Sequence, residues 1–112
     1  MTVALPPVAT VVSGLDFHAS AQPDAPVWLA PGRVGTVREL HARVAGCAAW
    51  LAGERVERGE IVGVSIADEI EHIVVAVALA SLGAAHAVLP THESATARAR
   101  LAERVGARRV VA

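Results

Sequence analysis

Apolar and polar residues follow a helical period in the segment that begins at Thr36. Apolar side chains recur on one stripe from Leu40 to Leu51, as on a helix that buries one face. Thr36 and Glu39 have the spacing of a capping box, in which each side chain accepts from the backbone N–H of the other residue. The pattern therefore predicts a helix that starts at Thr36 and stops at Gly53, since glycine favours helix ends.

Short apolar runs alternate with two further helical patterns in the rest of the chain. Ile61–Ile66 is apolar at successive positions, as in a strand covered on both faces. Asp68 and Glu71 repeat the capping spacing at the start of a helix that is apolar nearly all round, so we expect it to be buried against more than one layer. We predict strands at 61–66, 85–89 and 108–112, and helices at 68–83 and 94–105, with Arg98 and Arg104 facing outward. Strands joined by helices imply a parallel sheet with right-handed connections.

The N-terminal residues carry turn signals and little periodicity. Residues 1–14 contain Pro6, Pro7 and Gly14 and are predicted to form an extended lead-in. A short helix capped by Asp16 is expected over residues 15–21, followed by a β-hairpin whose turn is Pro31-Gly32.

The predicted fold class is α/β. We expect a β-hairpin followed by elements in the order α-β-α-β-α-β, with the strands in a parallel sheet of the three-layer type. Residues 15–112 form one α/β segment after the lead-in. The run Arg108–Ala112 looks like the beginning of a third strand. We therefore expect the chain to be an incomplete N-terminal subdomain of a larger fold.

Composition narrows the function classes. The formal net charge is -1 and the sequence pI is about 6.5, which argues against nucleic acid and anionic membranes as partners. Residues 73–89 are apolar, but Ser81, Gly83 and His86 interrupt them, so no membrane span is expected. Cys47 is the only cysteine, and no basic residue precedes the early apolar run, so we expect a cytoplasmic protein. All ten basic residues are Arg, and 54% of the chain is apolar, above the roughly 45–50% of soluble domains.

Few side chains suggest chemistry. His72, His86, His92 and Glu93 match no compact zinc spacing, and His72 and His86 fall on different elements, so we interpret them as ordinary polar residues rather than metal ligands. Cys47 lies on the apolar stripe of its helix, where a buried, inert thiol is expected.

Polar loops follow two of the predicted strands, where open parallel sheets bind ligands. They hold Ala67-Asp68 and Thr91-His92-Glu93. Helix capping by Asp68, and by Thr91 or Ser94, accounts for these residues, and we prefer it to ligand binding. His41 and Arg43 are expected on an exposed helix face, and residues 54–58 in a solvated connection.

Several of these weak signals occur together in a particular order. They are Thr36-Val-Arg-Glu39-Leu40, Trp50-Leu51-Ala52, Val56-Glu-Arg-Gly59-Glu60, Ile61-Val62-Gly-Val64, Leu82-Gly83-Ala84 and Val88-Leu89-Pro90. From Phe17 to Ala112 the chain resembles the N-terminal part of the AMP-forming adenylating enzymes. That superfamily includes acyl-CoA synthetases, fatty acyl-AMP ligases and the adenylation domains of peptide synthetases. The chain departs from the usual family pattern at Val37, where Tyr is common, and at Glu60, where Asp is common.

The resemblance implies an activity for a complete enzyme. Such enzymes use ATP and Mg²⁺ to convert a carboxylic acid into an acyl-adenylate and pyrophosphate, and usually pass the acyl group to a thiol. The phosphate loop that ends in Lys, and the mobile C-terminal domain, lie later in family sequences. Neither motif occurs between Met1 and Ala112, which contain no Lys. We therefore assign no catalytic, cofactor-binding or metal-binding residue to this chain.

The expected function is a scaffold segment of an ATP-dependent carboxylate-activating ligase, inactive alone and partnered by the remainder of the ligase. One alternative is a subunit of a split ligase that a second polypeptide completes. Another is a self-sufficient, small Rossmann-like binding module. The acid stays open among fatty, aryl and amino acids, as does the acceptor thiol, CoA or a carrier protein. The helix between Asp68 and Gly83 has more apolar circumference than one sheet can cover, so the isolated chain is also expected to self-associate, through this helix or through the strand edge at Arg108–Ala112.

Overall fold

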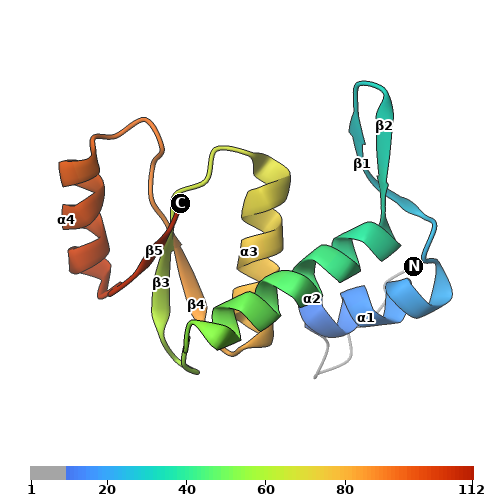
Figure 1. Cartoon of the computed structure of the whole chain (residues 1–112), viewed down its shortest axis with the longest axis horizontal. Helices are drawn as coiled ribbons and strands as arrows, with labels where there is room; N and C mark the ends of the chain where they lie inside the picture. The colour runs from blue at the N-terminus through green and yellow to red at the C-terminus, as the bar shows by residue number, and fades with distance from the viewer. Residues whose placement is uncertain (1–9) are drawn as a thin grey trace, which may run out of the picture. The chain divides into compact units, whose positions relative to one another are not determined.

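The computed structural model describes residues 10–112, and Figure 1 shows the order of their elements. The chain divides into two compact units, whose boundary falls between Arg43 and Val44. Residues 1–9 of the expected lead-in lie outside the described residues.

Helix α1 spans Val11–Ala21, so the predicted start of this helix at residue 15, and the extended conformation predicted for the residues just before it, were wrong. The Thr10 hydroxyl accepts the Ser13 N–H at 3.0 Å, and the Ser13 hydroxyl accepts the Thr10 N–H at 2.9 Å. This is a capping box with Ser in the place of the usual Glu or Gln, which is why the sequence pattern did not reveal it. Asp16, the predicted cap, lies inside the helix, with its Oδ1 2.9 Å from Nε2 of His41.

The predicted hairpin is confirmed as strands β1 (Pro26–Ala30) and β2 (Arg33–Thr36), which pair antiparallel. Gly32 in the turn has a φ of 73°, a left-handed conformation that glycine adopts readily. Trp28 pairs with Gly35, and a Cβ atom at residue 35 would lie only 1.8 Å from Cε2 of the indole. Gly35 thus permits the indole to lie directly on the opposite strand.

Helix α2 spans Val37–Gly53, as predicted, and tertiary contacts secure its start. The Thr36 hydroxyl accepts the Glu39 N–H at 3.2 Å, which confirms one half of the capping box. Instead of closing the other half, the Glu39 carboxylate forms an ion pair with Arg33 of the hairpin. The first two helical N–H groups donate to the carbonyls of Ala25 and Pro23 at 2.9 and 2.8 Å. Three of the N–H groups that a helix start leaves free are therefore satisfied.

The second unit contains a parallel sheet, as predicted. Its strands are β3 (Ile61–Val64), β4 (Ala85–Val88) and β5 (Val110–Val111), in the spatial order β4-β3-β5. Ile61 pairs with Ala85, and Gly63 pairs with Val110. The central position of β3 explains why this strand is apolar at successive residues.

Helices α3 (Glu69–Ser81) and α4 (Ala95–Val105) connect the strands. After β3 the chain forms β4 on one side of β3. After β4 it passes β3 and forms β5 on the other side of β3. Right-handed crossovers that run in opposite directions place their helices on opposite faces of a sheet. Figure 1 shows α3 and α4 on the two sides of the sheet, with β3 between them. The unit thus has the predicted three-layer arrangement.

The largest fully buried side chains are those of Leu51, Val62, Val64 and Leu79. They come from α2, β3 and α3, so the core lies where these elements meet. Helix α3 buries Val74, Val75, Ala78 and Leu79 but leaves Ile73 46% exposed, so its predicted burial against more than one layer holds only in part. The apolar run 73–89 is divided between α3 and β4, and no helix within residues 10–112 is long and apolar enough to cross a membrane.

Candidate functional site

The loops at the carboxyl ends of β3 and β4 contain the polar residues that the sequence singled out. The Asp68 carboxylate accepts the Glu71 N–H at 2.8 Å, and the Ser94 hydroxyl accepts the Ala97 N–H at 3.1 Å. These bonds cap α3 and α4, so the structural explanation of the loops is confirmed for Asp68 and Ser94. Thr91 is exposed, and Ser94 provides the cap in its place.

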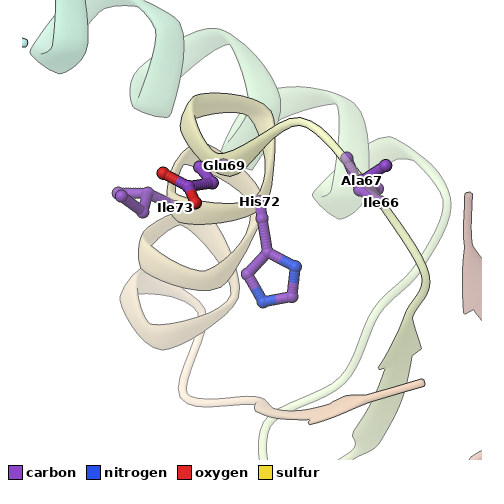
Figure 2. Close-up of a pocket in the computed structure, with 5 residues that line it drawn as sticks. All are labelled: Ile66, Ala67, Glu69, His72 and Ile73. Carbon is purple, nitrogen blue, oxygen red and sulfur yellow. The ribbon is translucent and has the colours of Figure 1, made fainter. Parts of the chain in front are cut away.

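A hollow of about 360 Å³ lies beside the loop between β3 and α3. It is lined by Ile66, Ala67, Glu69, His72 and Ile73 (Figure 2). Figure 2 shows the His72 ring extending away from the axis of α3, whereas the Glu69 side chain lies near Ile73. Three of the five lining residues are apolar, and the other two are Glu69 and His72.

His72 and His86 lie close together, although they belong to α3 and β4. Their ring centroids are 5.7 Å apart and their planes are inclined at 76°. They fall on different elements, as predicted, and the packing of α3 against β4 brings their rings together. His92 lies with its Nε2 3.8 Å from Oε1 of its neighbour Glu93. Within residues 10–112, no group of three or more His, Cys, Asp or Glu residues is arranged around a common point.

Ser65 and Arg98 form a polar contact that the sequence did not predict. Ser65 follows β3 and is buried, and its hydroxyl accepts from Nη1 of Arg98 at 3.2 Å. The prediction that Arg98 faces outward was wrong, since its residue is half-buried. Arg98 is three residues before Leu101, which is also half-buried, and this spacing places both on neighbouring parts of the helix surface. The contact joins α4 to the carboxyl end of the central strand.

Glu60 and Arg109 form an ion pair at the opposite end of the sheet. Arg109 Nε lies 2.7 Å from Glu60 Oε2, and both atoms are buried without another partner among the described residues. Arg109 also donates from Nη1 to the carbonyl of Glu54 at 2.7 Å. The predicted solvated connection thus supplies an acceptor that anchors the chain just before β5.

Cys47 is half-buried in α2. Burial raises the pKa of its thiol, because a thiolate is less stable away from water. A smaller thiolate fraction agrees with the inert role expected for this cysteine.

The sequence and the fold both match known proteins. The sequence model of the family described as AMP-binding enzyme matches residues 15–112. The chain therefore belongs to the AMP-binding enzyme family, whose N-terminal segment it represents. Comparison with curated proteins gives no match.

Three solved structures illustrate the likeness of the fold. The NpsA N-terminal subdomain of Klebsiella oxytoca has a TM-score of 0.81 and 24% identity, over 91% of this chain and 27% of its own. The artificially fused adenylation-PCP di-domain NpsA-ThdA from the same organism has a TM-score of 0.81 and 24% identity, over 89% and 19%. The fatty acyl CoA synthetase of Mycobacterium tuberculosis has a TM-score of 0.79 and 20% identity, over 88% and 20%. The chain thus spans about a quarter or less of each of these proteins, and it has the fold of their N-terminal segment.

Proposed function

We propose that this chain is the N-terminal scaffold of an ATP-dependent, carboxylate-activating ligase. In the proposed reaction a carboxylate oxygen attacks the α-phosphorus of ATP and pyrophosphate leaves; a thiol then takes the acyl group from the acyl-adenylate, and AMP leaves. The observation that carries the proposal is the family match over residues 15–112.

The polar side chains of the described residues support a scaffolding role. Asp68 and Ser94 cap helices, Ser65 binds Arg98, and Glu60 binds Arg109. These contacts lie within the segment and stabilise it. The chain also contains no Lys, the residue that often balances phosphate charge in such reactions. We infer that residues outside this segment supply the chemistry.

ATP–pyrophosphate exchange tests the proposal. The purified 112-residue chain, given ATP, Mg²⁺ and a panel of fatty, aryl and amino acids, should show no exchange above a blank without protein. The same panel is then given to the chain extended by the coding sequence that follows Ala112, or mixed with the product of an adjacent gene. Exchange in either case supports the proposal and distinguishes a continuous ligase from a split one.

Two results contradict the proposal. Exchange by the pure, unextended chain would mean that the segment carries chemistry of its own. If neither extension nor the neighbouring product yields exchange, and the chain alone binds a small ligand, the binding module is the better explanation.

A further inference from the structure

The contact between His72 and His86 joins two imidazoles whose nitrogens are free. His72 is half-buried on α3 and His86 is exposed on β4. Within residues 10–112 neither ring takes part in a hydrogen bond or an ion pair, and the two rings make an edge contact with each other. An imidazole without a hydrogen-bond partner retains a nitrogen lone pair for a metal ion.

The spacing of the rings is close to that of a chelating pair. Zinc lies about 2.1 Å from an imidazole nitrogen, and each nitrogen lies about 1.1 Å from its ring centre, so tetrahedral ligation places two ring centres about 5 Å apart. The observed centroids are 5.7 Å apart. The ring centres therefore need to approach by less than about 1 Å, and rotation of the two side chains about their χ angles can turn one nitrogen of each ring toward a common ion.

We propose that His72 and His86 form a two-histidine site for a zinc ion. Imidazole is a good ligand for this borderline-soft dication, and two protein ligands leave two coordination positions for water or an anion. His72 also lines the hollow beside the loop between β3 and α3. Bound zinc connects helix α3 to strand β4. The proposal does not depend on the ligase activity.

Zinc titration of the full chain, monitored by calorimetry after treatment with EDTA, tests the site. We expect one Zn²⁺ per chain, and an affinity that falls at least about tenfold in His72→Ala and in His86→Ala. Once one histidine has bound zinc, the second binds intramolecularly and raises the affinity. Removal of either ring therefore abolishes most of this gain in affinity. The double variant should therefore bind little more weakly than each single variant.

Three control variants exclude other groups. His92→Ala removes a histidine whose side chain is 82% exposed, and His41→Ala removes the partner of Asp16. Glu69→Gln removes a carboxylate that lines the hollow but points toward Ile73. Each of these variants should bind zinc within about twofold of the parent chain.

NMR of the histidine ring protons in the parent chain provides a second measurement that does not depend on the folding of any variant. Zinc should shift the signals of His72 and His86 first. The proposal is wrong if the chain shows no saturable zinc binding. It is also wrong if other histidines shift first, or if His41→Ala or His92→Ala weakens binding as much as His72→Ala does.

Discussion

Substitution of Gly35 by Ala should destabilise the hairpin unit, because the Trp28 ring occupies the space that a methyl group needs. An added Cβ atom would lie 1.8, 2.1 and 2.2 Å from three atoms of the indole. Carbon atoms in favourable contact lie about 3.5–4.0 Å apart. The ring must therefore move by about 1.5 Å or more, away from the strand that it covers.

The magnitude follows from the contacts that the ring loses. A Trp side chain buries about 150–250 Å², and Trp28 is half-buried. Loss of about 80 Å² of this contact costs about 2 kcal/mol at about 25 cal/mol per Å². The Arg33 guanidinium lies 5.9 Å from the ring, and loss of this cation–π contact adds about 0.5–1 kcal/mol. The methyl group restricts the unfolded chain and returns about 0.4–1 kcal/mol, so the net destabilisation is about 2 kcal/mol.

A double-mutant cycle with Trp28→Ala isolates the clash, with urea unfolding followed by circular dichroism. Gly35→Ala should cost about 2 kcal/mol in the parent chain and should be neutral or stabilising once the ring is absent. In a Trp50→Phe background, the fluorescence of Trp28 should also report a more exposed ring. The matched control is Gly46→Ala in α2, where the added methyl would meet no atom within 4 Å apart from the adjoining residues and the backbone of its own helix, and where helix stability should rise by about 0.5–1 kcal/mol. An equal cost with and without the Trp28 ring would refute this reasoning.

Three further outcomes are expected. Thr36→Ala should lower the free energy of unfolding by about 0.5–1 kcal/mol, in the lower part of the range for helix caps. The loss is small because main-chain carbonyls already satisfy the first two N–H groups of α2; an unchanged urea midpoint would contradict this. Cys47 should react with iodoacetamide more slowly than an unstructured cysteine peptide at the same pH, since burial raises its pKa, and equal rates in the folded chain would show that the thiol is freely accessible. The chain should self-associate at micromolar concentration in sedimentation experiments, because Trp50 and Val110 are 54% and 44% exposed near the edge strand β5; Trp50→Glu should weaken this association, and a monomer at every concentration would exclude it.

The sequence determined those helix ends at which a capping residue lies within one turn of the helix. Asp68 and Ser94 accept N–H groups three residues ahead, and Gly106 ends α4 with a φ of 78°. A cap acts within one turn of helix, so the spacing of a few residues is enough to predict it. Helix α1 began earlier than predicted because Ser13, rather than Glu or Gln, completes its capping box.

The parallel arrangement was also determined by the sequence, because apolar strands that alternate with helices have few other ways to bury both faces. Their spatial order β4-β3-β5 was decided by the tertiary structure. Pairing of β3 with β5 joins residues far apart in the chain, and no local period records which neighbour a buried strand selects.

Side-chain contacts between elements likewise required the tertiary structure. Trp28 over Gly35, Arg98 with Ser65, and the ring of His86 against that of His72 all depend on strand register or helix placement. Hydrophobic periodicity indicates which face of an element is buried, but it does not specify the residue on the facing element. The sequence therefore determined the elements, their order and the family resemblance, whereas packing decided which polar side chains meet.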